Sequence, residues 1–87
     1  MPTVWIPALL RPLTLGQETV QVPGQTVLEV LDALETKFPG IKARLCQNEQ
    51  LRPGMAVVID SQVARGSLSA AVEENSEVHF IPAIAGG

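Results

Sequence analysis

The sequence predicts a single two-layer α+β domain in which one amphipathic helix packs on one mixed sheet. Three observations support this prediction. Residues 27–38 repeat apolar side chains at helical spacing, strand-like apolar runs lie on both sides of this segment, and the chain has 87 residues, of which 46% are hydrophobic. That length suits one compact domain and leaves no room for two. Because only three residues are aromatic, the core must depend on aliphatic side chains.

Two strands are expected before the helix. Residues 3–10 are rich in branched and apolar side chains, and Pro7 within them indicates an edge position or a local irregularity. The Arg-Pro pair at residues 11–12 marks a turn. Residues 18–22 (ETVQV) alternate polar and apolar side chains, as is typical of a half-buried strand, and Pro-Gly at residues 23–24 ends it.

The helix is the clearest element of the chain. Thr26 precedes it and Glu29 follows three residues later, which is the spacing of a capping box that satisfies two unpaired backbone donors. Pro39 and Gly40 end the helix. The apolar residues that share one face at helical spacing are Val27, Val30, Leu31, Leu34 and Phe38.

Shorter elements are expected in the second half of the chain. Residues 41–46 are predicted to add a short helical turn, and residues 47–54 a polar loop. Residues 56–59 (AVVI) are predicted to form a strand that is buried on both faces, with residues 63–64 pairing back as a very short strand. Residues 68–72 fit a brief helical turn that places apolar side chains on the core.

The last strand is predicted at residues 77–81, after a solvated turn at residues 73–76, and Pro82 ends its hydrogen bonding because it has no N–H. This strand is apolar enough to lie in the middle of the sheet beside the first strand. One helix on such a mixed sheet of four to five strands is the β-grasp, the fold of ubiquitin. We therefore expect a β-grasp domain at residues 1–82 and a flexible tail at residues 83–87.

Composition excludes several classes of function. The net charge of −3 lacks the basic character of a nucleic-acid-binding face. A single cysteine excludes an internal disulfide framework, and the chain contains no metal-ligand cluster and no glycine-rich phosphate loop. The apolar stretch VWIPALL at residues 4–10 is too short to span a bilayer. We expect a soluble, cytoplasmic protein that does not bind membranes and is a monomer when free.

Several short segments together resemble one family. They occur in the order and at the spacing seen in the small sulfur carriers of the MoaD/ThiS group, and the stretch IPALLRPLTLGQ is most similar to CysO-type carriers. The chain departs from the family at Ala83, where a second proline is common, and at Asp60-Ser61, where Asn-Gly is common. The matching segments are Leu10-Arg11, TVLEVLDALETKFPG, LRPG, EENSEV and the terminal IPAIAGG.

The resemblance implies a chemical role for the last two residues. A terminal carboxylate is ionised at neutral pH and is a poor electrophile, so it must be activated before it can accept sulfur. In the family this activation is adenylation by ATP within a MoeB/ThiF-like partner enzyme, after which a sulfur donor converts the terminus to a thiocarboxylate. Gly87 would supply the reacting carboxyl. Gly86 would supply clearance, because a residue without a Cβ can enter a narrow active site.

The residues before the two glycines are predicted to bind the partner. Pro82 stiffens the base of the tail and so limits the entropy lost on docking. Ile84 is an apolar side chain that a solvated tail does not need, which favours docking in a groove of the partner. The complete predicted set is Ile81, Pro82, Ala83, Ile84 and Ala85.

The resemblance leaves the pathway and the chemistry of transfer open. A carrier, which is not itself an enzyme and binds no cofactor, would deliver sulfur to a pyridoxal-phosphate cysteine synthase or to the large subunit of molybdopterin synthase. In the second case it would count as that enzyme's small subunit. The alternative is a ubiquitin-like modifier joined to lysines through Gly87, and a third possibility is a binding module that merely keeps the fold.

Other polar residues receive a structural interpretation. Cys46 is read as a small buried hydrophobe, because no His or Cys at a recognisable spacing accompanies it. His79 lacks a nearby nucleophile to activate and is read as structural or exposed. Glu73 and Glu74 are read as a solvated turn. Arg11 and Arg65 could contact an acidic patch of a partner, although exposed arginines need no such explanation.

Overall fold

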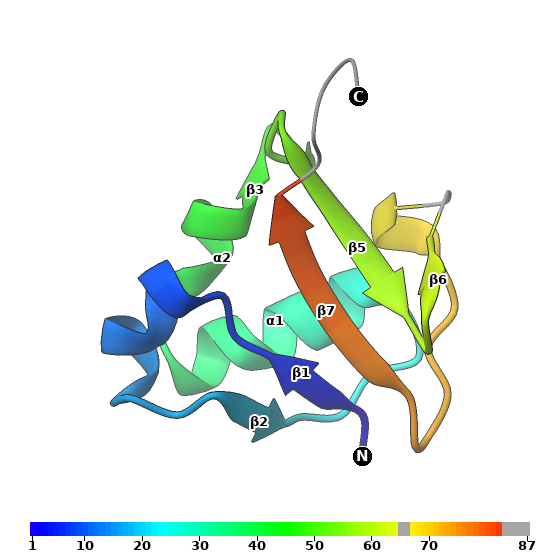
Figure 1. Cartoon of the computed structure of the whole chain (residues 1–87), viewed down its shortest axis with the longest axis horizontal. Helices are drawn as coiled ribbons and strands as arrows, with labels where there is room; N and C mark the ends of the chain where they lie inside the picture. The colour runs from blue at the N-terminus through cyan, green and yellow to red at the C-terminus, as the bar shows by residue number, and fades with distance from the viewer. Residues whose placement is uncertain (65–66, 83–87) are drawn as a thin grey trace.

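A computed structural model describes residues 1–64 and 67–82. These residues form a five-stranded mixed sheet with helices on one of its faces (Figure 1). The strand order is β2-β1-β7-β5-β6, with β3 and β4 forming a separate two-stranded hairpin. The strands of the large sheet are β1 (Thr3–Trp5), β2 (Thr19–Gln21), β5 (Met55–Ile59), β6 (Gln62–Val63) and β7 (Glu77–Pro82).

Strand β7 lies at the centre of this sheet. It pairs in parallel with β1, where Val4 is opposite Val78. On its other side it pairs antiparallel with β5, where Val57 is opposite Phe80. All four side chains are buried, so the first and last strands of the chain meet inside the core. The predicted position of the last strand beside the first is confirmed.

The predicted first strand is wrong beyond Trp5, because residues 8–14 form a 3-10 helix, η1 (Ala8–Thr14). Pro7 has no N–H to continue a strand ladder, and its carbonyl oxygen instead accepts a hydrogen bond from the Leu10 N–H at 2.9 Å. Thr14 is fully buried, and its hydroxyl lies within hydrogen-bond distance of the Arg11 carbonyl oxygen. This segment covers one end of the core.

The main helix, α1 (Val27–Lys37), agrees with the prediction. Its N-cap is Thr26, whose hydroxyl oxygen accepts a hydrogen bond from the Glu29 N–H at 3.2 Å. The Glu29 carboxylate accepts from the N–H of Gln25 at 2.8 Å, one residue before the usual capping-box partner. All five residues predicted on the apolar face are buried: Val27, Val30, Leu31, Leu34 and Phe38.

The chain then turns into helix α2 (Ile41–Leu45), as predicted, and forms a hairpin where a loop was predicted. The hairpin pairs β3 (Cys46–Gln47) with β4 (Gln50–Leu51). The two residues between these strands, Asn48 and Glu49, have φ values of 54° and 61°. Such left-handed pairs are typical of a type I′ turn, which usually contains glycine. Because glycine is absent here, this hairpin is difficult to predict from the sequence.

Strand β5 was predicted to be buried on both faces, and this prediction is wrong. Only Val57 is buried, whereas Ala56, Val58 and Ile59 are partly exposed. The reason is the layer arrangement, because α1 lies across one face of the sheet and no helix of the described residues lies on the other (Figure 1). An apolar run therefore does not guarantee two covered faces when the domain has only two layers.

The described part of the segment between β6 and β7 contributes one short helix and one buried apolar side chain. Strand β6 lies one residue earlier than predicted. The 3-10 helix η2 (Ser67–Ser69) is shorter than the predicted helical turn, because Ala71 forms an antiparallel bridge with Thr26. Val72 is 4% exposed and joins the core.

The turn before β7 is solvated except at Ser76, which is 3% exposed. The Ser76 hydroxyl donates a hydrogen bond to Oδ2 of Asp60 at 2.8 Å, and the Glu77 N–H donates to Oδ1 at 2.9 Å. Asp60 thus joins the β5–β6 turn to the start of the central strand. Both hydrogen bonds hold the pKa of the Asp60 carboxyl below its ordinary value. The hydrogen bond from the backbone N–H of Glu77 has the larger effect.

From the backbone conformation of the β5–β6 turn, we expect one substitution to stabilise the domain. Asp60 and Ser61 have φ values of 50° and 73°, a region that L-residues with a Cβ occupy at a cost. Ser61→Gly should raise the free energy of unfolding by about 0.5 to 1 kcal/mol, because glycine has no such cost. Urea unfolding measures the change. Ser61→Ala is the matched control, and equal stabilisation by alanine would show that backbone strain is not the cause.

Candidate functional site

The base of the predicted tail is held in the sheet. Strand β7 continues through Pro82, one residue further than predicted, with Ile81 opposite Ala56 and Pro82 opposite Met55. The side chain of Ile81 is exposed on the face of the sheet away from α1. Of the predicted site, the structure thus places two members at the end of the central strand. The remaining predicted residues lie outside the described part of the chain: Ala83, Ile84, Ala85, Gly86 and Gly87.

The sheet face away from α1 is a feature that the sequence analysis did not identify as part of the site. We call it the open face. Residues opposite one another in the strand registers form a row across it: Thr19, Trp5, His79, Val58 and Val63. It also includes Ile81, so this surface is continuous with the base of the tail. The other members of the open face are Thr3, Gln21, Ala56 and Glu77.

An aromatic and acidic cluster lies at the centre of the open face. The rings of Trp5 and His79 stack with their centroids 5.1 Å apart and their planes 9° from parallel. The indole N–H of Trp5 donates a hydrogen bond to Oε1 of Glu77 at 3.1 Å, and His79 Nε2 lies 3.9 Å from the same oxygen. The side chains of His79 and Glu77 are 38% and 58% exposed, so the cluster is accessible. The interpretation of His79 as a structural or surface residue is compatible with this position.

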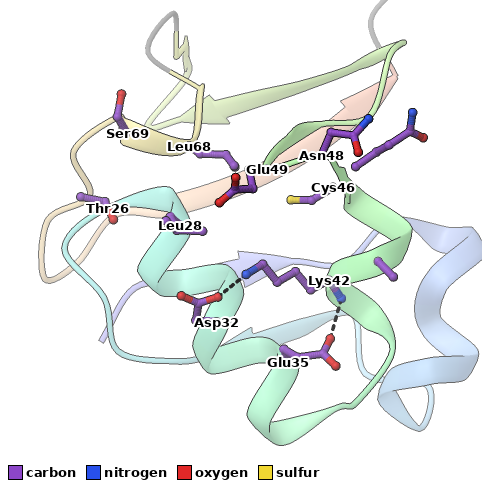
Figure 2. Close-up of a pocket in the computed structure, with 12 residues that line it drawn as sticks. Thr26, Leu28, Asp32, Glu35, Lys42, Cys46, Asn48, Glu49, Leu68 and Ser69 are labelled. Carbon is purple, nitrogen blue, oxygen red and sulfur yellow. Dashed lines mark hydrogen bonds and ion pairs between the residues drawn. The ribbon is translucent and has the colours of Figure 1, made fainter.

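An open groove lies on the opposite, helical side of the molecule, between α1, the β3–β4 hairpin and η2 (Figure 2). It is an open depression of about 1080 Å³ with Leu28 and Leu68 on its surface and the Lys42–Asp32 ion pair at one end. Neither Ile81 nor Pro82, the two predicted site residues that the structure describes, lines it. The groove and the open face are therefore separate surfaces.

Cys46 lies at the edge of this groove and is only 9% exposed. Burial raises the pKa of its thiol above the ordinary value, so the neutral form predominates at neutral pH. A thiol needs the opposite shift to act as a nucleophile. The interpretation of Cys46 as a buried hydrophobe agrees with this environment.

Other polar side chains have structural partners. The Arg11 Nε–H donates to the Ile6 carbonyl oxygen at 3.2 Å, which holds η1 against β1, while Arg65 lies outside the described residues. Glu73 and Glu74 are exposed, as predicted, and Glu74 pairs with the amino group of Met1 at 2.7 Å. Within residues 1–64 and 67–82 no group of acidic, histidine and cysteine side chains could hold a metal ion. No helix there is long and apolar enough to cross a bilayer.

Glu35 connects the two helices. Its carboxylate accepts hydrogen bonds from the N–H of Gly40 and from the N–H of Lys42, each at 2.9 Å (Figure 2 shows the second). Both hydrogen bonds lower the pKa of the Glu35 carboxyl below its ordinary value of 4.5. The hydrogen bond from Gly40 has the larger effect. The ionised form therefore stabilises the α1–α2 corner.

The Glu35 hydrogen bonds predict an acid-dependent loss of stability. A carboxyl whose pKa is lower in the folded state stabilises the fold above its unfolded pKa, and this contribution is lost as the pH falls through the folded value. The urea midpoint should therefore decrease as the pH falls from about 5 through the folded pKa of Glu35. Glu35→Gln should lower the midpoint at neutral pH and reduce the loss on acidification.

The matched control for this prediction is Glu18→Gln. Glu18 is exposed, and its carboxylate has no hydrogen-bond partner among the described residues, so this variant changes the net charge alone. If Glu35→Gln and Glu18→Gln give the same acid profile as the wild type, the helix corner does not depend on an ionised Glu35.

Comparison with known proteins identifies the family. The model described as the ThiS family matches residues 4–87, which is nearly the whole chain. The chain belongs to the ThiS family. The resemblance to MoaD/ThiS carriers seen in the sequence is thereby confirmed, and the similarity to CysO-type carriers is confirmed by the relatives below.

Two relatives and one further solved structure show how close the similarity is. The sulfur carrier protein CysO of Mycobacterium tuberculosis is 34% identical over 90 residues, covering 98% of this chain and 97% of that protein. A chain of the Amycolatopsis orientalis BexX/CysO complex superposes with a TM-score of 0.91 at 39% identity, covering both chains completely. The H. volcanii small archaeal modifier protein 1 has a TM-score of 0.75 at 25% identity and covers 95% of this chain and 97% of its own. The predicted β-grasp fold is confirmed by these structures.

Proposed function

We propose that this ThiS-family protein is a sulfur carrier whose terminal Gly87 carboxyl is converted to a thiocarboxylate that donates sulfur in biosynthesis. The observation that supports this most strongly is the match of the ThiS family over residues 4–87, which includes the Gly-Gly end. The central strand supports it as well, because β7 anchors the segment from which the tail continues at Ile81 and Pro82. The family and its CysO relatives support a carrier rather than an enzyme.

The proposed chemistry takes place on Gly87 in two steps. Within a MoeB/ThiF-like activating enzyme, an oxygen of the Gly87 carboxylate attacks the α-phosphorus of ATP and pyrophosphate leaves. The acyl-adenylate is a strong electrophile, which the free carboxylate is not. Hydrosulfide from a sulfur donor then attacks the carbonyl carbon, AMP leaves with the C–O bond electrons, and a proton is released as the thiocarboxylate forms. The chain itself binds no cofactor in this scheme.

The small residues of the tail suit entry into two different active sites. Gly86 and Gly87 have no Cβ, and Ala83 and Ala85 have only one methyl group, so the segment occupies little width. Ile84 is the one larger side chain, and we propose that it docks in a groove of the partner, while Ile81 contacts the partner from the end of β7. The same tail would later enter the enzyme that accepts the sulfur.

The similarity to CysO favours the cysteine branch for this second enzyme. The acceptor would then be a pyridoxal-phosphate enzyme that holds an activated serine. In the other branch the chain would act as the small subunit of molybdopterin synthase and bind stably to the large subunit. Sedimentation of the chain with each purified enzyme distinguishes a stable subunit from a transient donor.

Tandem mass spectrometry of the C-terminal peptide from the native host tests the proposal. We expect sulfur in place of oxygen at Gly87. Intact mass is insufficient, because oxidation of Met1 or Met55 gives nearly the same nominal change as replacement of oxygen by sulfur. An unmodified carboxylate, even after incubation with ATP, sulfide and the adenylating enzyme, would contradict the proposal.

A second candidate function is conjugation to other proteins. It is supported by the similarity to the H. volcanii small archaeal modifier protein 1 at 25% identity. The same Gly87 adenylate would be attacked by a lysine amine instead of hydrosulfide, giving an isopeptide bond and AMP. A ladder of conjugates on a blot of the tagged chain, lost when Gly87 is deleted, would establish this activity.

A further inference from the structure

The charged side chains of the described residues are distributed unevenly over the molecule. The five strands of the large sheet carry one formally charged side chain, Glu77, and no lysine or arginine. The basic side chains in the described part of the chain lie in η1, in the two α-helices and before β5: Arg11, Lys37, Lys42, Arg44 and Arg52. The open face is thus weakly acidic and otherwise apolar or neutral.

Trp5 has an unusual place for the only tryptophan of the chain. A domain this poor in aromatic side chains would gain core volume by burying its largest ring, yet Val4 points into the core and Trp5 points to the open face. His79 stacks on the ring, and Glu77 accepts the indole N–H, so the orientation of the ring is fixed before any partner arrives. Rigid, partly exposed tryptophans are the side chains that most often dominate binding energy at interfaces.

The Glu77 carboxylate can accept further hydrogen bonds. Trp5 and His79 both approach Oε1, while Oε2 accepts no hydrogen bond from the described residues, and the side chain is 58% exposed. An acidic oxygen next to an indole ring is complementary to a guanidinium, which pairs with carboxylates through a planar fork and also stacks on aromatic rings. A lysine ammonium would satisfy the charge without the planar contact.

The tail alone cannot distinguish this carrier from others with a Gly-Gly end, because its side chains are mostly methyl groups or hydrogen. Discrimination must therefore come from the folded body, and it is needed first at adenylation, where ATP is consumed. The open face is suited to this task because it is continuous with Ile81 at the base of the tail.

We propose that the Trp5–His79 stack and the Glu77 carboxylate form the selectivity element with which this carrier docks on its activating enzyme, by receiving an arginine side chain of that enzyme. This inference rests on the proposed function, since it names the surface that presents Gly87 for adenylation. Trp5 supplies the planar contact and Glu77 the charge. His79 is a positioning residue that holds the indole ring.

The test uses the full chain and the adenylating enzyme of the same organism, with pyrophosphate release as the readout. Trp5→Ala should raise KM for the carrier about tenfold or more with kcat unchanged, because a docking contact acts before the chemical step. Glu77→Gln keeps the acceptor for the indole N–H and removes the charge. It should raise KM about threefold to tenfold and flatten the dependence of KM on salt.

Glu49→Gln is the matched control, because it removes the same charge from the β3–β4 hairpin on the helical side. It should leave KM unchanged. Because Trp5→Ala could also weaken the fold, its urea midpoint is measured and the wild type is examined separately by 19F NMR after labelling with fluorotryptophan. The single resonance, from Trp5, should shift when the enzyme is added.

The outcomes separate the inference from the proposed function. If the wild type forms no adenylate and no thiocarboxylate, the proposed function fails. If the wild type is activated while the Trp5 and Glu77 variants keep its KM and the fluorine resonance does not move, the inference alone is overturned. It is also overturned if the variants are activated normally and lose only sulfur transfer, which would assign the face to the acceptor enzyme instead.

Discussion

Deletion of Gly86 and Gly87 is expected to abolish thiocarboxylate formation without changing the urea midpoint of the domain. The deletion moves the terminal carboxyl back by two residues, about 7 Å along an extended chain. Misplacement of a reacting group by about 1 Å can already cost about a hundredfold in rate. The core formed by the described residues ends at Phe80, so the deletion removes none of these buried side chains. Mass spectrometry after incubation with ATP, sulfide and the adenylating enzyme measures the product.

Gly87→Ala separates length from clearance in this experiment. It keeps the number of residues and the carboxyl, and adds only a Cβ next to the reacting carbon. We expect an intermediate loss of thiocarboxylate if the active site is narrow. A deletion variant that still accumulates sulfur on Ala85 would show that the two glycines are not required.

The second large effect is expected at Gly24, in the connection between β2 and α1. A Cβ built on Gly24 would lie 2.7 Å from Cγ2 of Val30 and 2.8 Å from its backbone nitrogen. Val30 is fully buried in the first turns of α1, and its N–H donates to the Thr26 carbonyl oxygen at 3.0 Å, so its backbone has little freedom to move. Gly24→Ala should therefore destabilise the domain by about 3 kcal/mol, near the upper end of overpacking effects.

Gly40→Ala is the control for Gly24→Ala, with urea unfolding as the measurement. Gly40 has a φ of +100°, but no atom of the described residues, apart from its own chain neighbours, lies within 4 Å of the position where its Cβ would be. Its substitution should cost about 1 kcal/mol, from the backbone conformation alone. Equal losses at the two positions would contradict the close approach of the β2–α1 connection to Val30.

The helix and the position of the last strand beside the first were predictable because their signals are local and repeated. Five apolar residues at helical spacing define α1. The apolar run around Phe80 indicates that β7 lies in the interior of the sheet. The 3-10 helix after Pro7 was missed because branched and apolar side chains suit a strand equally well. The burial of Ser76 was missed because its partner, Asp60, is sixteen residues away and becomes its neighbour only in the folded sheet.

The sequence alone predicts the tail as the candidate site, whereas it does not predict the open face. The Gly-Gly end is contiguous and has a recognisable chemical meaning. Trp5, Glu77 and His79 come from strands at opposite ends of the chain, and only the parallel register of β1 with β7 brings them together. Alternation within β1 could have shown that Trp5 and Val4 face opposite ways, but it does not tell which side is covered.

The parallel pairing of β1 with β7 also has a consequence for the order of folding. Thr3 is opposite Glu77, so the contact that completes the centre of the sheet closes a loop of 74 residues, the difference between these two positions. Contacts this distant in sequence form slowly compared with local ones. During synthesis, β1, β2 and α1 are made before β7. Val4 and Leu31, which are fully buried in the folded domain, are therefore not yet enclosed by the complete core. The sheet therefore forms completely only after synthesis has reached β7, the strand that carries the tail.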